Sequence, residues 1–346
     1  MTSNPQYDRE TTATEVAEAF SDEIRGKTVV IVGVSPQSLG ESMSLALASQ
    51  SPLLLVLASR TLSKIEDVAT KIRGPYPNVS LQLVEIDLSS LEAVRKGAAT
   101  INRVVNQIDI LINNAGVVMQ THAFTTDGLE LQFGTNHVGP FLLTNLLMPK
   151  ILKAAQSSQL KGSTRIVNVT SQGHVISPIR FSDYNLHRRP EDIPPEERPM
   201  TNANMSFDPP PGVTYVPFVA YGQSKTANIL LSLYLTRHLS QNGVISIATH
   251  PGSIWTDLSR NLDEKYTKLI SKTGGFWKSL DQGSATTLVA ALDPKLSEDD
   301  RVIYLSDCQV AQSAGHASDE KAAERLWKLS EDIVGQKFEL EAASRL

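Results

Sequence analysis

Short apolar runs alternate with stretches of helical periodicity from Lys27 onward. Seven β-branched or leucine-rich runs predict strands, at 28–32, 53–57, 79–86, 108–112, 165–169, 244–248 and 302–305. Helical periodicity between them predicts helices at 40–50, 62–73, 91–105, 134–155 and 220–240. Continuous apolar strands separated by helices are typical of a parallel sheet covered on both faces. The pattern therefore predicts an α/β, doubly wound parallel sheet of about seven strands, with its ligand site at the carboxyl ends of the strands.

Two segments lie outside this alternation. Residues 1–25 are polar and contain a short amphipathic helix at 14–20, which predicts an N-terminal extension packed on a single domain, 26–346. Residues 180–217 form a proline-rich insert, because so many prolines exclude a long helix or a central strand. Two interpretations of the insert stay open. It either forms a wall of a substrate pocket, with Phe207, Tyr215 and Phe218 as contacts, or it is a surface excursion.

Composition and charge narrow the function classes. The formal net charge of -5 provides no basic surface for nucleic acid. The single cysteine, Cys308, rules out an intrachain disulfide and fits a reducing compartment. No run reaches the length of a membrane span, and the N-terminus lacks the apolar core of a secretory signal. We therefore expect a cytoplasmic enzyme without a membrane span or a nucleic-acid partner, and we expect no metal site.

Tyr221 and Lys225 are the first candidates for chemistry. Four residues apart on a predicted helix, they lie on the same helix face. An ammonium beside a phenol favours the phenolate and lowers the pKa of the phenol, which could then transfer a proton near neutral pH. The spacing alone occurs often by chance, so its interpretation depends on the ends of the predicted strands.

The first two strand ends suggest a dinucleotide cofactor. The first strand runs into a glycine-containing turn whose backbone N–H groups could approach a phosphate at the start of the next helix. The candidate residues of this turn are Gly33, Ser35, Gln37, Ser38, Leu39 and Gly40. The second strand ends at Ser59 and Arg60, with no carboxylate for a ribose diol. A hydroxyl and a guanidinium there favour the 2′-phosphate of NADP(H).

The other strand ends carry small and polar residues suited to a cofactor or a substrate. Asp87 is expected either to accept from an adenine amino group or to cap the next helix. Ser171 could bond a substrate oxygen, and Asn136 is an unfavourable residue in the middle of a predicted helix. The remaining cofactor-binding candidates are Leu88, Asn114, Ala115, Gly116, Pro251, Gly252, Ile254 and Thr256.

Together these motifs resemble the short-chain dehydrogenase/reductase superfamily, whose members have a single Rossmann-type domain. The resemblance covers about residues 26–310 and follows the order of the family's motifs; it is strongest to fungal members related to retinol dehydrogenases and WW-domain oxidoreductases. It implies the strand order 3-2-1-4-5-6-7. Gln37 departs from the family, because it stands where a glycine is usual, and its side chain is expected to crowd or cover the cofactor pyrophosphate.

The resemblance also implies an activity. Tyr221 would be the general acid/base, and Lys225 would lower the pKa of Tyr221 and bond the nicotinamide ribose. Ser171 would hold the substrate oxygen, and Asn136 would bend its helix and anchor a water. The expected function is NADP(H)-dependent interconversion of an alcohol and a ketone or aldehyde.

The expected substrate is a hydrophobic small molecule, and secondary metabolism is the expected setting. Residues 257–280 would cover the substrate. A homodimer is a further possibility that the resemblance raises. The alternatives are a cofactor-binding scaffold or sensor with weak redox activity, and a non-redox lyase or cyclase on the same fold.

Overall fold

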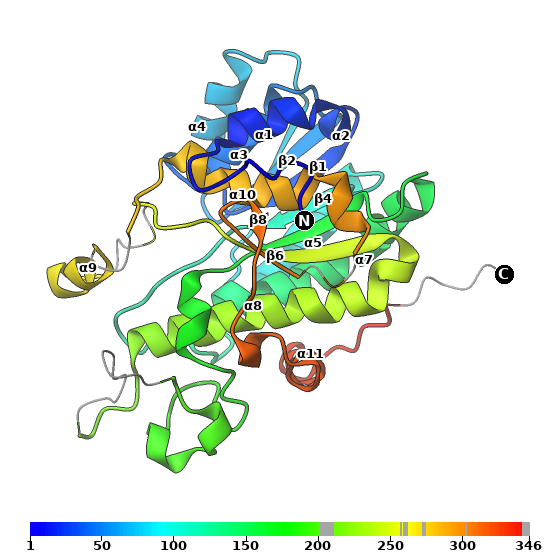
Figure 1. Cartoon of the computed structure of the whole chain (residues 1–346). Coiled ribbons are helices and arrows are strands. Elements are labelled where there is room, and N and C mark those ends of the chain that lie inside the picture. Colours follow the sequence, from blue (N-terminus) through cyan, green and yellow to red (C-terminus); the bar gives the residue numbers. More distant parts are fainter. Residues whose placement is uncertain are drawn as a thin grey trace.

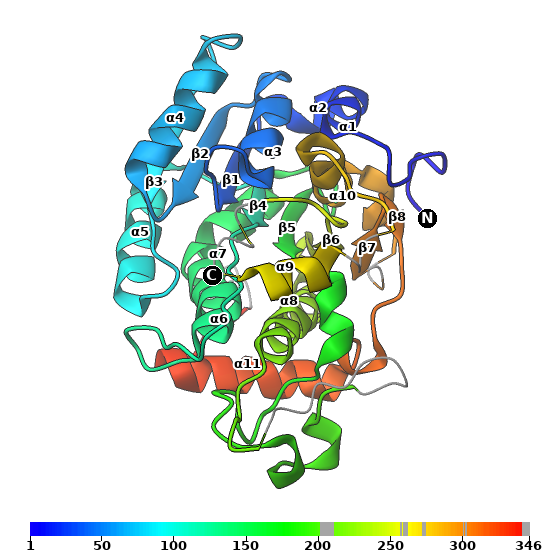
Figure 2. The same ribbon diagram turned by 90° about the vertical axis from the view of Figure 1, so that its left-hand side faces the viewer.

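One sheet of eight strands runs through the molecule. The computed structural model describes residues 1–200, 211–256, 258, 262–271, 275–299, 301 and 303–340, without the side chains of 265, 266, 269 and 270. The strand order is β3-β2-β1-β4-β5-β6-β7-β8, as Figure 2 shows. The strands are β1 (Thr28–Val32), β2 (Leu54–Ser59), β3 (Leu81–Glu85), β4 (Ile110–Asn113), β5 (Thr164–Val169), β6 (Val244–His250), β7 (Tyr304–Ser306) and β8 (Gln309–Val310). The predicted fold class is confirmed.

All described strand pairs are parallel except the pair at one edge of the sheet. The first seven strands pair in parallel, with β1 between β2 and β4. The two-residue strand β8 pairs antiparallel with β7 and is the one strand that the sequence did not predict. The turn before it, Asp307-Cys308, has positive φ at both residues, 48° and 62°. Such a turn is typical of a tight hairpin, but it is usually signalled by Asn-Gly or Asp-Gly.

Helices cover both faces of the sheet (Figures 1 and 2). One face carries α3 (Leu39–Ala48), α4 (Leu62–Arg73) and α10 (Leu280–Leu292), with α1 (Ala13–Ala19) and α2 (Ser21–Ile24) outside them. The other face carries α5 (Leu91–Val104), α6 (Leu131–Phe133), α7 (Gly139–Ser157) and α8 (Pro217–Leu239). Each face has its own apolar core, built from one set of alternating strand residues and the helices above it. Among the described helices, none is long and apolar enough to cross a membrane.

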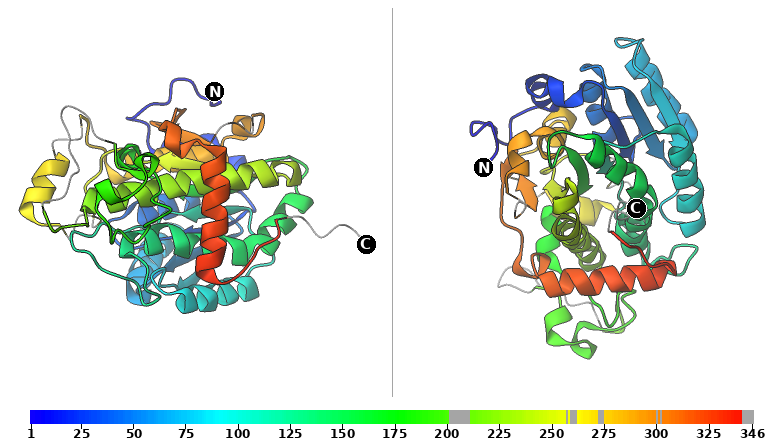
Figure 3. Two further views of the ribbon diagram at one scale, coloured as in Figure 1. Left: turned by 90° about the horizontal axis from the view of Figure 1, so that it is seen from below. Right: turned by 90° about the vertical axis from the view of Figure 1, so that its right-hand side faces the viewer.

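The C-terminal helix α11 (Glu320–Val334) crosses the outer side of α8, as Figure 3 shows. Its Trp327 is buried between two aromatic rings, stacked 4.2 Å from Tyr234 and edge-on to Phe141 at 4.9 Å between ring centroids. The helix is amphipathic, and the periodicity of its sequence would have predicted it. In contrast, α10 is buried almost all round, so its sequence has no polar face to signal a helix.

The predicted helix at 134–155 is interrupted. A π-helical turn, Gly134–Val138, separates α6 from α7 and contains Asn136. The side chain of Asn136 bonds the backbone of Val117 on both sides of its amide, which ties the turn to the loop after β4. A π-helical turn is rare and often marks a functional position. The predicted bend at Asn136 thus coincides with a π-helical turn.

The N-terminal extension is fastened at several points. Thr12 and Glu15 form a capping box at the start of α1, and α1 packs against α10 and α3. Thr14 bonds Asp281 at the start of α10. Ser3 bonds Asp293 just past the end of α10 through its backbone N–H, at 2.7 Å, and through its hydroxyl. The extension therefore runs the length of α10.

Replacing Trp327 by alanine tests the packing of α11 on α8. Large-to-small changes of a buried aromatic side chain cost about 3–5 kcal/mol. We expect Trp327→Ala to lower the free energy of unfolding by about that amount, measured by chemical denaturation. The neighbouring exposed Lys328→Ala is the matched control and should stay within about 0.5 kcal/mol of the parent. Equal stability of Trp327→Ala and the parent would show that α11 does not pack on α8 in solution.

Candidate active site

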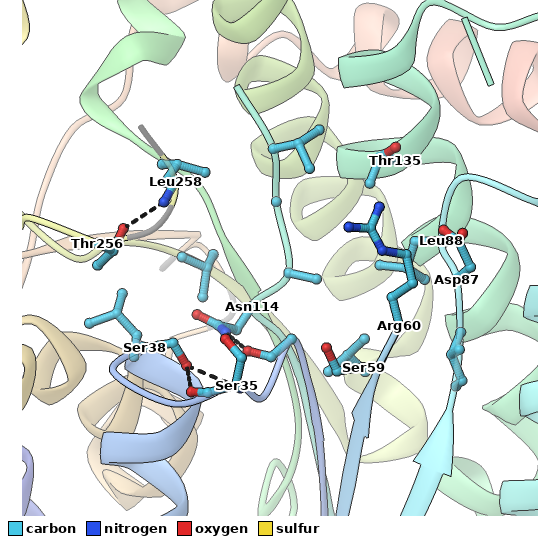
Figure 4. Close-up of a pocket in the computed structure, with 18 of the residues that line it drawn as sticks. Ser35, Ser38, Ser59, Arg60, Asp87, Leu88, Asn114, Thr135, Thr256 and Leu258 are labelled. Atoms are coloured by element: carbon cyan, nitrogen blue, oxygen red, sulfur yellow. Dashed lines mark hydrogen bonds between the residues drawn. The ribbon is translucent and has the colours of Figure 1, made fainter. Parts of the chain in front are cut away.

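A cleft of about 260 Å³ lies at the carboxyl ends of the central strands. It is bounded by the β1–α3 turn, the ends of β2, β3 and β4, the start of α8 and the loop after β6 (Figure 4). Most of the predicted site residues line it. They are Gly33, Ser35, Ser38, Leu39, Ser59, Arg60, Asp87, Leu88, Asn114, Ala115, Gly116, Tyr221, Lys225, Pro251 and Thr256.

The β1–α3 turn is packed so tightly that two of its positions exclude any side chain. A Cβ at Gly33 would lie 2.6 Å from the Cα of Ala115, and the φ of Gly33 is +95°. A Cβ at Gly40 would lie 2.3 Å from the carbonyl oxygen of Gly33. Ser38 caps α3, and its hydroxyl also donates to the carbonyl of Ser35 at 2.6 Å, as Figure 4 shows. The conformation of the turn is therefore fixed by its packing and hydrogen bonds, and it forms one wall of the cleft.

Gln37, whose side chain was predicted to crowd or cover the cofactor pyrophosphate, does not line the cleft. Its φ is +56°, so it adopts the left-handed backbone that glycine adopts without strain. Its side chain is exposed, and its backbone N–H donates to the carboxylate of Glu41 at 3.2 Å. Gln37 belongs to a group of described candidates that lie outside the cleft lining, namely Gln37, Gly40, Asn136, Ser171, Gly252 and Ile254. Glu41 also binds Lys71 at 2.9 Å, which fixes its carboxylate beside the turn.

One end of the cleft carries cations and hydroxyls. Arg60 and Ser59 follow β2, and Thr61 and Lys64 line the same end, although neither of the latter two was among the predicted site residues. Asp87 does not cap α5. Ser90 performs that role, and Asp87 instead accepts from the backbone N–H and hydroxyl of Ser89, at 2.9 and 2.7 Å. This end of the cleft therefore combines positive charge with a single, locally bonded carboxylate.

At the other end, Tyr221 and Lys225 project from the first turns of α8. The Lys225 Nζ lies 5.5 Å from the centre of the Tyr221 ring and donates to the carbonyl of Val169 at 3.0 Å. Burial lowers the pKa of Lys225 to about 8. Burial also raises the pKa of Tyr221 to about 12, against a smaller lowering by its hydrogen bond with Ser171. The direction predicted from the Tyr–Lys spacing is therefore wrong for the protein alone, because the effect of burial exceeds that of the hydrogen bond with Ser171.

Ser171 lies against Tyr221 although it does not line the cleft. It follows β5 by two residues, caps the 3₁₀ turn Gln172–Ile176, and accepts from the backbone N–H of Gly173 at 3.1 Å. Gly173 packs flat on the phenol, since a Cβ there would lie 3.1 Å from the Tyr221 ring and 3.5 Å from the Ser171 Oγ. The serine and tyrosine hydroxyls thus share one corner of the site.

Asn136 lies behind this corner. Its amide donates to Ser224 Oγ at 2.9 Å, and Ser224 in turn donates to the carbonyl of Tyr221 at 2.7 Å. A Cβ at Gly116 would lie 3.3 Å from Lys225 Nζ and 3.5 Å from Asn136 Oδ1, so both polar groups approach the backbone of Gly116. Four side chains that are far apart in sequence, Asn136, Ser171, Tyr221 and Lys225, therefore lie in one region.

Sequence reasoning missed several residues of the inner cleft. Thr135 lines it from the π-helical turn, and Val117, Val169 and Thr170 line it from the ends of β4 and β5. Thr135 precedes Asn136 and Val117 follows the predicted Asn114–Gly116 turn, so their position in sequence was an available signal. Leu258, expected to cover a substrate, also lines the cleft.

The proline-rich insert is tied to the loop between β4 and α6. The hydroxyl of Tyr215 bonds the Met119 carbonyl at 3.1 Å, Glu130 Oε1 at 3.3 Å and Gln132 Nε2 at 2.7 Å. The hydroxyl is thus fully engaged, which makes Tyr215 an anchor for the insert. Phe218 lies on α8, and Phe207 lies outside the described residues.

Within the predicted cover, 257–280, described residues on both sides of one helix contact other parts of the chain. Helix α9 (Glu264–Ser271) lies on the side of the carboxyl ends of the strands, in front of them in Figure 2, and projects away from the sheet in Figure 1. Before it, Asp263 and Gln120 exchange two hydrogen bonds, at 2.7 and 2.8 Å. After it, Trp277 stacks on Trp255 at 4.4 Å, and Arg9 lies over the Phe276 ring at 4.8 Å. The side chains of Tyr266 and Leu269 lie outside the described part of the chain.

Glu130 makes the anchoring of the insert sensitive to pH. Burial raises its pKa to about 7, partly offset by the backbone N–H groups of Gln132 and Phe133 and by the Tyr215 hydroxyl. The folded protein holds this proton more tightly than the unfolded chain does. The resulting stabilisation is complete below about pH 4.5 and is lost as the pH rises through about 7.

We therefore expect Glu130→Gln to remove this pH dependence. Relative to that variant, the wild type should lose on the order of 2 kcal/mol of unfolding free energy between pH 5 and pH 8. Denaturant titrations at both pH values measure the difference. The exposed Glu324→Gln should keep the wild-type slope. Parallel pH profiles of Glu130→Gln and the wild type would rule out Glu130 as the titrating group.

Comparisons with known proteins show which family the chain resembles. The sequence model of a family described as short chain dehydrogenase matches residues 27–185. The chain is 33% identical to retinol dehydrogenase 12 of Mus musculus over 92% of this chain and 89% of that protein. It is 36% identical to the oxidoreductase fscI of Fusarium equiseti, over 72% of this chain and 95% of the relative.

Solved structures show the same fold. An uncharacterised protein from Mycobacterium Paratuberculosis superimposes with a TM-score of 0.63 at 27% identity, covering 91% of this chain and 96% of that one. An NADPH-bound carbonyl reductase from chicken fatty liver superimposes with a TM-score of 0.55 at 21% identity, covering 84% of this chain and all of the other. From its sequence relatives, its fold and the arrangement of its cleft, the chain belongs to the short-chain dehydrogenase family of oxidoreductases.

Proposed function

We propose that the protein is an NADP(H)-dependent oxidoreductase that interconverts an alcohol and a ketone or aldehyde on a hydrophobic small molecule. The observation that carries the proposal is the convergence of Tyr221, Ser171 and Lys225 at one end of a cleft whose other end holds Arg60 and Lys64. A proton donor and a cationic recess at opposite ends of one cleft suit a substrate and a phosphorylated dinucleotide bound together.

The residues of the cleft fit such a cofactor. Ser35 offers a hydroxyl beside the start of α3, where the helix dipole favours a phosphate, and the hydroxyl of Ser38 holds the shape of this turn. Ser59, Arg60 and Lys64 offer donors and positive charge for a 2′-phosphate, with no carboxylate at the end of β2 to bind a free ribose diol. The Pro251 and Thr256 side of the cleft would face the nicotinamide.

The cofactor, when bound, supplies the hydride; the chain supplies the proton and the electrostatics. Tyr221 would donate its phenolic proton to the substrate oxygen in reduction and accept it in oxidation. Ser171 would donate a hydrogen bond to the same oxygen and stabilise its developing charge. Lys225 would stabilise the phenolate that Tyr221 becomes, because a positive charge in a water-poor site acts strongly over this distance.

Apolar walls support a hydrophobic substrate. Val117 and Leu258 line the cleft, and the exposed ring of Trp255 lies in the same loop as Pro251 and Thr256. Retinol, which names one of the relatives, is an apolar alcohol, and we extend that substrate class to this chain. A role in fungal secondary metabolism, a cytoplasmic location and a homodimer stay predictions.

Tyr221→Phe tests the proton-transfer role. Loss of a general acid typically costs about 10²–10⁴-fold in rate. We expect kcat to fall by that factor in NADPH oxidation with a panel of apolar ketones and aldehydes. The affinity for NADPH, titrated by fluorescence, should change by less than about threefold. A wild type no faster than the Phe variant on every substrate, despite bound NADPH, would leave a scaffold or sensor as the better description.

Arg60→Ala tests the choice of cofactor. A charge-assisted hydrogen bond contributes about 1.5–3 kcal/mol, so the KM for NADPH should rise about 10–100-fold while the KM for NADH changes little. Arg73→Ala, at the end of α4 and exposed, provides the control and should leave both values unchanged. An equal rise of both KM values in Arg60→Ala would argue against recognition of the 2′-phosphate.

A further inference from the structure

The peptide unit that follows Ser171 is held from both sides by histidines. Its carbonyl oxygen, on Ser171, accepts from the ring Nδ1 of His174 at 2.8 Å and from the backbone N–H of His174 at 3.1 Å. Its N–H, on Gln172, donates to the ring Nδ1 of His250 at 3.2 Å. The carbonyl and N–H of a trans peptide point in opposite directions and lie in one plane. Bonds on both sides therefore fix the orientation of that plane.

The tautomer of His174 follows from its partners. The Ser171 carbonyl can only accept, so Nδ1 must carry the proton. The backbone N–H of Ala314 can only donate, and it points at the other ring nitrogen, Nε2, at 3.1 Å. Only the neutral ring with its proton on Nδ1 satisfies both partners. His174 is 1% exposed, which also favours the neutral form.

His250 has the opposite tautomer. Its Nδ1 faces two donors, the N–H groups of Gln172 at 3.2 Å and Gly252 at 3.5 Å, so Nδ1 must be the acceptor and Nε2 carries the proton. His174 thus donates a hydrogen bond to the oxygen of the peptide, and His250 accepts one from its N–H. The two rings come from different elements, the 3₁₀ turn after β5 and the end of β6.

We propose that His174 and His250 are positioning residues that hold the Ser171–Gln172 peptide between them and thereby aim the Ser171 hydroxyl at the substrate oxygen beside Tyr221. The orientation of this peptide sets the backbone of Ser171, which is extended at φ -155° and ψ 158°. Through the backbone it also sets the direction of the Ser171 side chain. The proposal rests on the function proposed above.

The bonding atoms suggest a matched pair of substitutions. In both histidines Nδ1 contacts the peptide, and the side-chain amide of asparagine reaches that position. The amide of glutamine reaches the position of Nε2 instead. Asparagine therefore preserves the contact at either site, as donor at 174 or acceptor at 250, whereas glutamine loses it. His316→Asn serves as a control, because His316 bonds the His174 carbonyl and does not touch the Ser171–Gln172 peptide.

Steady-state kinetics on the best carbonyl substrate compare kcat between the glutamine and asparagine variants. Misplacement of a reacting group by about 1 Å costs up to about 100-fold. We expect His174→Gln and His250→Gln to lower kcat about 10–100-fold, with the NADPH affinity within about threefold of the wild type. His174→Asn, His250→Asn and His316→Asn should retain kcat within about threefold. In a Ser171→Ala background, adding His174→Gln should cause no further loss. Equal losses in the Asn and Gln variants, or a full additional loss on Ser171→Ala, would overturn the proposal.

Nitrogen-15 NMR of histidine-labelled protein tests the same arrangement without turnover. The ring shifts, assigned with the variants, should show the proton on Nδ1 of His174 and on Nε2 of His250. The reverse tautomer at either ring would contradict the proposal even if the enzyme is active. If the tautomers are as predicted and the variants fold normally but the protein shows no turnover, the proposed function fails while the two histidines still hold the Ser171–Gln172 peptide.

Discussion

The buried ammonium of Lys225 constrains the site more than any other group. Burying a charge is costly unless polar groups surround it, and Lys225 is only 3% exposed. Val169 provides a carbonyl, and the backbone of Gly116 leaves the ammonium and Asn136 room to approach. Burial still lowers the pKa of Lys225 to about 8 and raises the pKa of Tyr221 to about 12. In the protein alone, therefore, the phenol is protonated at neutral pH and ready to act as an acid.

Elements far from the cleft hold these groups in place. The π-helical turn that contains Asn136 also contains His137, whose ring bonds Ser330 on α11 at 2.8 Å, so α11 contacts the residue next to Asn136. The proline-rich insert is anchored through Tyr215 to the loop that begins beside the cleft. The loop carrying Ala314 reaches His174, which bonds Ser171. The site thus depends on tertiary contacts from most of the chain.

The sequence predicted the parts of the fold that follow a local rule. Apolar runs and helical periodicity located seven strands and the longer helices up to residue 240, and Tyr221, Lys225, Ser171 and Asn136 do converge. What it missed depends on tertiary context. The hairpin strand β8 is two residues long, α10 has no polar face, and the exposed orientation of Gln37 follows from a left-handed backbone that no neighbouring residue signals. The raised pKa of Tyr221 likewise follows from burial, which the Tyr–Lys spacing does not report.

Transfer of a labelled hydride is the most direct test of the central claim, that the cleft joins a hydride donor to a proton donor. NADPH carrying deuterium at the transferable C4 position would be turned over with an apolar ketone, and the product analysed by mass spectrometry. The account predicts an alcohol with one deuterium on the former carbonyl carbon, formed in step with NADPH oxidation. A product without deuterium, or one formed without NADPH oxidation, would contradict it and favour a lyase or cyclase.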